Sequence, residues 1–347
     1  MAETKKISAG QLMMLFLLAR IMHTMIFRAD EFRSGLPLIL GLLCSTAAEA
    51  VLAIPAVWYF NSGGLDPVAE ISGKYAPWIK VIYSIYFTVI AGATVSLFTQ
   101  FLSSEFSNVA EPFIAIILLV AAALYCAYYG IEGLARAGTV VFWLVVVLFV
   151  SMAAVNEGSF EWLNIRPLTP GDGRPFWEYF IESLSSSWWL PMLCLLGAHL
   201  RSGVIKAAYG FLVLKLAIVE TLLVLVTLIL WRYVKVLKYP IFALGAFAKS
   251  DFIQRFDAIN MFVWAVNCVL VVGVYIFISS KPLKKGRPLT ALFAILTVAY
   301  GIFAYKTGLK IDEPWFLGFK LIGIGLLGVI IPIAAGAKLM IKRSGEK

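Results

Sequence analysis

The chain is a succession of apolar runs of about 20 residues, separated by short polar stretches. A helix of that length crosses the roughly 30 Å of hydrocarbon in a bilayer, and a helix satisfies all of its backbone groups there. About ten runs fit: 9–28, 37–60, 78–101, 110–129, 134–155, 176–199, 204–231, 257–279, 288–306 and 316–340. The pattern predicts an all-α polytopic membrane protein with about ten transmembrane helices.

The stretches between the runs are short. The longest, 156–175 and 232–256, are too short to form a soluble domain. We therefore expect residues 1–347 to form a single integral membrane domain. Within it, five runs make a first repeat at about 9–155 and five make a second repeat at about 176–340.

The sixth run contains ESLSSSWWLPM, residues 182 to 192, an unusual stretch for a helix surrounded by lipid. Pro191 lacks a backbone donor and its ring clashes with the carbonyl of Ser187, so we expect the helix to open among Ser185 to Trp188. An alternative is purely architectural. Small residues let membrane helices pack closely, and a proline kink needs no ligand.

The first run also has polar residues at mid-depth, namely Arg20, His23 and Thr24. We expect its helix to be irregular near Arg20. Interrupted helices at corresponding positions of two halves are typical of transporters that bind solute at the bilayer midplane. The two runs together predict a 5+5 inverted-repeat, transporter-like fold with discontinuous first and sixth helices.

The predicted pocket draws on four helices. On the third run Tyr86 and Thr94 fall within about 80° of each other, and on the eighth Asn260 and Asn267 are two turns apart. The candidate ligand-binding residues are Ala19, Arg20, His23, Thr24, Tyr86, Thr94, Ser185, Ser186, Ser187, Trp188, Asn260 and Asn267. This small, mostly neutral set suits an amphoteric solute whose carboxylate meets Arg20 or free amides.

Charged residues within the runs need partners, because an unpaired charge at mid-membrane costs several kcal/mol. Glu49 lies at the centre of the second run and Lys215 near the centre of the seventh. Lys215 and Glu220 are five residues apart, about 140° around an α-helix, so we do not expect them to pair on one face, and we expect their partners to come from elsewhere. Arg20 has two interpretations, as a carboxylate ligand or as the partner of Glu49 or Glu182 in an ion pair.

Composition and charge agree with a membrane protein. The chain is 61% hydrophobic and 14% charged, with a net charge of +9. Its Lys and Arg lie mostly between the runs and at the chain ends, which favours phospholipid head groups over nucleic acid. KPLKKGR at 281–287 and KLMIKRSGEK at the end support a topology with both termini in the cytoplasm.

The sequence offers no catalytic or metal-binding pattern. The two histidines, His23 and His199, belong to no HExxH motif, and neither a G-x-S-x-G nor a phosphate-binding loop is present. The four cysteines lie in apolar runs without the spacing of a zinc site. We therefore expect no enzyme activity, no cofactor and no metal.

Several motifs, taken in order along the chain, resemble the spore-germination permease family, the B subunit of GerA-type germinant receptors. They are KISAGQL near the start, IPAVWYF, GIEGLARAG, NIRPLTPGDGRPFWEYF and KYPIFALGAFAKSDFIQRFDAINMFVW. The most specific is QRFDAINMFVW, with Arg255, Asp257 and Trp264. The resemblance implies the fold of amino acid, polyamine and organocation transporters. It also implies a place in the inner membrane of a bacterial spore, beside an A-type subunit and a lipoprotein C-type subunit.

The resemblance also implies that the ligand is a small nutrient germinant, usually an amino acid. At the start of the eighth run Asp257 can cap the helix, and we favour a structural role for it and Arg255. The residues expected to have structural or coupling roles are Glu49, Glu182, Lys215, Arg255 and Asp257.

Two functions remain open at this stage. The first is a receptor subunit that binds a germinant and signals through partner subunits. The second is a secondary permease that imports an amino acid or related solute with a coupling ion. A third class, an ion-conducting or purely structural subunit, is disfavoured because no ring of charges marks a pore.

Overall fold

The computed structural model describes residues 7–25, 36–71, 75–106, 111–165, 176–200, 202–230, 233, 237–247, 256–283 and 286–345. Helices make up almost all of these ranges, and their only β-structure is an isolated parallel bridge between Ile7 and Leu200. The all-α prediction is confirmed.

The helices follow the predicted runs closely. In the first half they are α1 (Ala9–Met25), α2 (Leu36–Leu52) with α3 (Ile54–Asn61), α5 (Ala76–Glu105), α6 (Pro112–Tyr128) and α7 (Gly130–Val155). In the second half they are α8 (Phe176–Ser185) with α9 (Trp189–Leu196), α10 (Val204–Lys215) with the π-helix η4 (Leu216–Glu220) and α11 (Thr221–Leu230), α13 (Phe256–Ser280), α14 (Arg287–Lys306), and α15 (Pro314–Gly323) with the π-helix η6 (Ile324–Ile330) and α16 (Ile331–Gly345).

Short helices connect these spans. They are α4 (Pro67–Glu70), α12 (Pro240–Phe247) and the 3₁₀ turns η1 (Glu157–Ser159), η2 (Trp162–Ile165), η3 (Gly197–His199) and η5 (Lys281–Leu283). Among the described residues, seven helical stretches are long and apolar enough to cross a membrane, while α1 and α6 are shorter apolar helices of 17 residues. The remaining span is the broken pair α8 and α9.

Local sequence signals set where several helices begin. Ser8 and Gln11 form a reciprocal capping box before α1, in which the Ser8 amide donates to Gln11 Oε1 (3.0 Å) and the Gln11 amide to Ser8 Oγ (3.1 Å). Asp66 caps α4 by accepting from the amides of Val68 and Ala69. Proline stands in the first turn of α3, α5, α6, α14 and α15, where its missing donor leaves no bond unmade.

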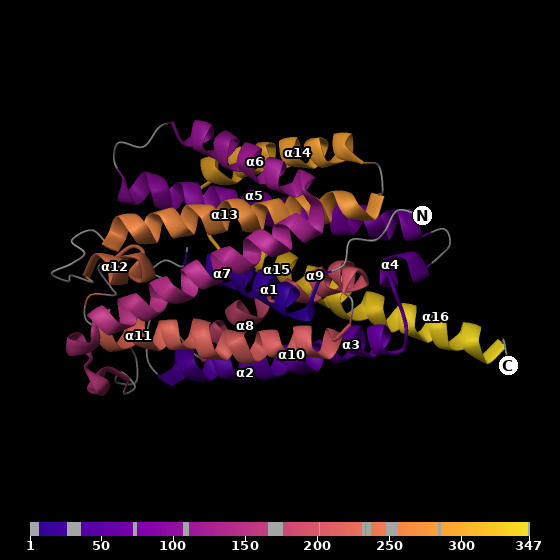
Figure 1. Ribbon diagram of the computed structural model, residues 1–347, viewed down its shortest axis with the longest axis horizontal. Coiled ribbons are helices and arrows are strands. Elements are labelled where there is room, and N and C mark those ends of the chain that lie inside the picture. The colour runs from indigo at the N-terminus through magenta and orange to yellow at the C-terminus, as the bar shows by residue number, and fades with distance from the viewer. Residues whose placement is uncertain are drawn as a thin grey trace.

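Helices from the two halves of the chain interleave. In Figure 1, α13 runs through the middle of the bundle, and it packs against α5, α6, α7 and α14. On the other side α1 packs against α10, and α2 against α8. This packing places the first, second, sixth and seventh predicted runs next to one another. Both chain ends lie at the same end of the bundle in Figure 1, as an even number of crossings requires.

One expectation about the first helix is wrong. The described part of that span, α1, is continuous from Ala9 to Met25 and shows no irregularity near Arg20. Its polar residues face the protein interior, and Thr24 Oγ1 donates to the carbonyl of Arg20 (3.1 Å) within the helix. Burial against other helices removes the need for a break there.

Candidate functional site

The sixth span is interrupted where the sequence predicts. The α-helix α8 ends at Ser185 and α9 begins at Trp189, and between them the amides of Ser186 and Ser187 bond to carbonyls three residues back. Pro191 lies in the first turn of α9, so its missing donor and its ring prevent the α-helical bonds from continuing through Ser187. The predicted opening among Ser185 to Trp188 is confirmed.

The serine hydroxyls at the break are used unequally. Ser185 and Ser186 both donate to the carbonyl of Glu182, at 2.7 and 3.1 Å. The Ser187 hydroxyl is buried and has no hydrogen-bond partner among the described residues. A buried hydroxyl without a partner is costly, so this position offers an unused donor and acceptor beside the break.

A small cavity lies between the break and α1. It is lined by Arg20, His23, Thr24, Leu38, Leu42, Tyr179, Glu182, Ser183, Ser186 and Leu223. Its volume is about 30 Å³, enough for a water molecule or two. The structure thus brings predicted residues of the first and sixth runs to one space, while their role in binding a ligand stays a prediction.

Arg20 enters this region from α1. Its Nη2 donates to Ser183 Oγ (3.2 Å), which also receives a hydrogen bond from Ser45 Oγ (2.6 Å). Its Nε is buried without a partner, and among the described residues no carboxylate lies within the 4.0 Å of an ion pair. The alternative in which Arg20 pairs with Glu49 or Glu182 is therefore not found in the described part of the chain.

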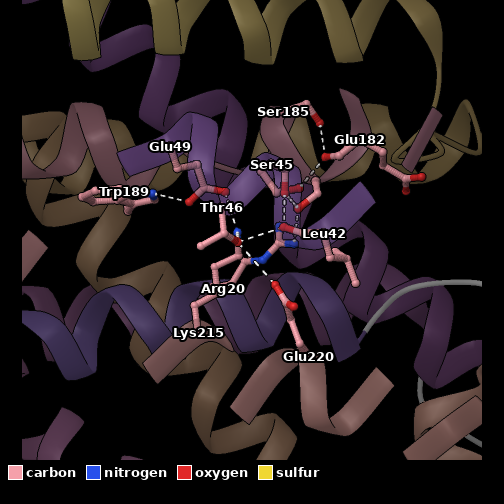
Figure 2. Close-up of polar contacts among 12 residues, drawn as sticks. Arg20, Leu42, Ser45, Thr46, Glu49, Glu182, Ser185, Trp189, Lys215 and Glu220 are labelled. Carbon is pink, nitrogen blue, oxygen red and sulfur yellow. Dashed lines mark hydrogen bonds and ion pairs between the residues drawn. The ribbon is translucent and has the colours of Figure 1, made fainter. Parts of the chain in front are cut away.

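Glu49 pairs instead with Lys215. Lys215 Nζ lies 2.6 Å from Glu49 Oε1 and 2.8 Å from Thr46 Oγ1, and both charged side chains are fully buried. Trp189 Nε1 donates to the other carboxylate oxygen of Glu49 at 2.9 Å. Glu49 of α2 and Lys215 of α10, the two charges whose partners the sequence did not identify, therefore pair with each other (Figure 2).

Lys215 and Glu220 form no ion pair with each other in the described part of the chain, as expected, and each takes a partner from α2; both, however, contact Thr46 Oγ1. Thr46 Oγ1, which accepts from Lys215, lies 3.3 Å from Glu220 Oε1 and can donate to it. The expectation that Lys215 and Glu220 face apart assumed an α-helix, but Leu216–Glu220 is a π-helix. Because π-helical bonds join residues five apart, a residue and its fifth neighbour lie almost one above the other.

Other predicted residues of α1 and α9 lie nearby. The ring of His23 packs edge-on against Trp188, with centroids 4.6 Å apart, and His23 Nε2 is buried without a partner. Ala19 is buried on the same helix but does not line the cavity.

The predicted contributions from the third and eighth runs do not reach the cavity. Tyr86 stacks on Phe319, and Thr94 donates to the carbonyl of Ile90 in its own helix. Asn267 Nδ2 donates to the carbonyl of Leu18 on α1 (3.3 Å). The side-chain amide of Asn260 is buried with no partner among the described residues. The two residues of each pair are spaced to share one face of their helix, but that face packs against other helices and not against the cavity.

Arg255 and Asp257, for which we favour a structural role, can be placed only in part. Asp257 lies in the first turn of α13, as predicted, whereas Arg255 falls outside the described residues. The structural role of the two residues stays a prediction.

Sequence reasoning missed several members of the network and one further buried charge. They are Ser45, Thr46, Ser183, Trp189, Glu220 and Lys320. Thr46 could have been found from its spacing, since it precedes Glu49 by three residues and so shares its helix face. Lys320 lies within a predicted span, and its fully buried Nζ donates to the carbonyl of Ile311 (3.1 Å).

Comparison with known families places the chain. Residues 65–307 match the model of a family described as spore germination protein. The chain belongs to the spore germination protein family. The matched range contains the break and Lys215 with Glu220, while the residues of α1 and α2 that face the cavity precede it.

The fold agrees with that of a solved transporter. A structure of a Na⁺-coupled sialic acid symporter, in its substrate-bound outward-open state, matches with a TM-score of 0.55 at 12% identity. The match covers 96% of this chain and 89% of the symporter. At this identity the likeness shows the fold alone, which is that of a polytopic transporter. Among curated protein sequences no match is found.

Proposed function

We propose that this protein is the membrane subunit of a spore germinant receptor, which binds a small nutrient and signals germination through partner subunits. Membership of the spore germination protein family and the transporter fold support this assignment. The proposed partners are an A-type and a lipoprotein C-type subunit, and the proposed location is the inner spore membrane with both termini in the cytoplasm.

The observation that carries the proposal is the cavity between α1 and the broken sixth span. One wall holds the guanidinium of Arg20, which has an unpartnered Nε, and the other holds the hydroxyls of Ser183 and Ser186. A carboxylate suits the planar guanidinium, and an ammonium group suits hydroxyls and the exposed carbonyls of an interrupted helix. An amino acid carries both groups, so it is the proposed germinant.

Ligand entry requires the cavity to widen, because about 30 Å³ accommodates water and not an amino acid. The break in the sixth span allows the cavity to widen. The amides of Ser186 and Ser187 and the carbonyl of Ser187 lack the α-helical bonding of the flanking helices, so α8 can shift against α9 with little loss of backbone hydrogen bonds.

Ser186→Leu tests the pocket, since the larger side chain fills the cavity and removes a hydroxyl. We expect the concentration of amino acid needed for half-maximal germination to rise about tenfold or more, at a near-normal protein level. The matched control is Ser151→Leu, at a partly exposed serine of α7 that does not line the cavity. An unchanged dose response in Ser186→Leu would place the ligand elsewhere.

A permease is the second candidate, favoured by the likeness to a symporter. It would import an amino acid or related solute with a coupling ion. Labelled amino acid supplied to the purified protein in liposomes separates the two: a receptor binds the solute without accumulating it, while a permease accumulates it and loses both properties in Ser186→Leu.

A further inference from the structure

We propose that Glu220, held beside Lys215 and Thr46 by the π-helix η4, is an intramembrane proton-binding site coupled to the solute cavity. The inference rests on the proposed binding of a carboxylate-bearing solute at Arg20 for its coupling, but not for the proton site itself. The chemical step is the simplest one: a carboxylate takes up one proton and becomes a neutral acid.

The three groups of the network differ in how firmly their charge is held. Glu49 receives Lys215 Nζ on one oxygen and Trp189 Nε1 on the other, so both oxygens of its anion are satisfied. The Lys215 ammonium donates one hydrogen bond to Glu49 and another to Thr46. Glu220 receives one long contact of 3.3 Å from Thr46, so it loses least by becoming neutral.

The Thr46 hydroxyl makes the Glu220 contact reversible. Its oxygen lies within hydrogen-bond distance of both Glu220 Oε1 (3.3 Å) and the carbonyl of Leu42 (3.0 Å), while its single proton can serve only one of them. With Glu220 ionised, the hydroxyl can donate to the carboxylate. With Glu220 protonated, the hydroxyl can donate to Leu42, and Glu220 can in turn donate to the Thr46 oxygen.

The charges around Glu220 couple its protonation to the binding of a solute carboxylate. The charged groups that act on Glu220 electrostatically are Lys215 of its own span, Arg20 of α1 and Glu49 of α2. When ionised, these four groups carry two positive and two negative charges, and Glu182, which lines the cavity and acts on Arg20, adds a further carboxylate. A solute carboxylate brought to Arg20 adds a negative charge next to Glu220, and a proton on Glu220 removes that repulsion.

The cavity is close enough for this coupling. Two of its lining residues, Leu42 and Leu223, are one turn from Thr46 and Glu220 along their helices, and Arg20 borders both the cavity and the network. Figure 2 shows the side chains of Glu49, Thr46 and Glu220 converging beside Arg20. The Nε of Arg20 is buried without a partner, so this guanidinium has a donor left for a carboxylate.

The π-helix is the feature that an ordinary membrane span would lack. Its insertion interrupts the regular bonding between α10 and α11 and costs stability, and such segments occur frequently at functional sites. In a continuous α-helix Glu220 would point about 140° away from Lys215, the residue that contacts Thr46. The π-helix of the seventh span therefore brings a second carboxylate to the pair.

Infrared difference spectroscopy of the purified protein in lipid nanodiscs tests the site without any solute. Between neutral and mildly acidic buffer we expect the wild type to gain the band of a protonated carboxylic acid. Glu220→Gln, which keeps the size and polarity of the side chain, should lack that band. The control Glu157→Gln, at an exposed residue of η1, should retain it. Absence of the band from the wild type, or its survival in Glu220→Gln, would overturn the proposal.

A second variant tests the role of the Thr46 hydroxyl, which contacts both Lys215 and Glu220. Thr46→Val keeps the side-chain volume but removes the hydroxyl, so the pH at which the band appears should move, while Ser151→Val should leave it unchanged. A band that titrates identically in Thr46→Val and wild type would contradict a site built on Thr46. Thermal unfolding of each variant identifies any that is misfolded.

Coupling is measured with L-alanine as the probe. We expect its affinity for the wild type to differ about fivefold or more between the two pH values, and to be the same at both in Glu220→Gln. A pH-independent affinity in the wild type overturns the coupling. Failure of L-alanine to bind at either pH counts against the proposed pocket, and the infrared result then decides the proton site alone.

Discussion

At the scale of single residues, the interior of the helix bundle contains a cluster of buried charged and polar side chains, although the chain is mostly hydrophobic. Lys215, Glu49 and Thr46 are buried together, and Arg20 is hydrogen-bonded to Ser183, which also accepts from Ser45. A buried charge is tolerated only with a partner, so removing one member costs more than removing both.

Lys215→Met tests this asymmetry. It leaves Glu49 as a buried carboxylate without its cation, and we expect it to lower the free energy of unfolding by about 3–5 kcal/mol. The double variant Glu49→Gln/Lys215→Met removes both charges while the Gln carbonyl still accepts from Trp189, so most of the loss should be recovered. Thermal or denaturant unfolding in detergent measures both. A double variant no more stable than the single would show that the pair is not the reason for the burial.

At the scale of elements, the interrupted sixth span is held by a second irregular segment. The π-helix η6 packs against α9, and a Cβ added at Gly328 would lie 2.9 Å from Leu190 Cβ and 3.2 Å from Pro191 Cδ. The hydroxyl of Tyr83 donates to the carbonyl of Leu327 at 2.5 Å, which secures η6 from the other side. The broken helix thus has a close-fitting support in the tenth span.

Gly328→Ala should therefore destabilise the protein by about 1–3 kcal/mol, because neither the α9 backbone nor Pro191 can move aside easily. Gly325→Ala, in the same π-helix but with open space around its Cα, is the matched control and should be close to neutral. Unfolding midpoints in detergent compare the two. Equal effects would mean that the contact between η6 and α9 is looser than the structure indicates.

At the scale of the whole molecule, the two chain ends at one end of the bundle require an even number of membrane crossings. The excess of Lys and Arg near the termini and at 281–287 predicts that this end faces the cytoplasm. Exposed serines at both ends of the bundle, Ser159 in η1 and Ser344 in α16, provide positions to test it.

Single-cysteine labelling checks this topology in a variant whose four native cysteines are replaced. In intact cells that express the protein, a membrane-impermeant maleimide should label Ser159→Cys and not Ser344→Cys. Permeabilised cells should give labelling at both positions. The reverse pattern in intact cells would invert the orientation and place both termini outside.

The sequence by itself determined the spans and the position of the break. Runs of about 20 apolar residues have one stable form in lipid, and a proline within such a run opens it one turn upstream, so both follow from local rules. Local signals also predicted which residues are buried polar ones, such as Arg20 and Glu49.

Only the tertiary structure decided which of these residues meet. Glu49 and Lys215 are separated by 166 positions, and no spacing rule connects two helices from different halves of the chain. The π-helix at Leu216–Glu220 has no composition that distinguishes it from an α-helix, so the sequence predicted that Lys215 and Glu220 do not pair but not that both reach Thr46. The third and eighth runs have suitable polar faces, yet packing turns them toward other helices. Helix formation is decided within a segment, whereas the polar network is decided by which segments pack together.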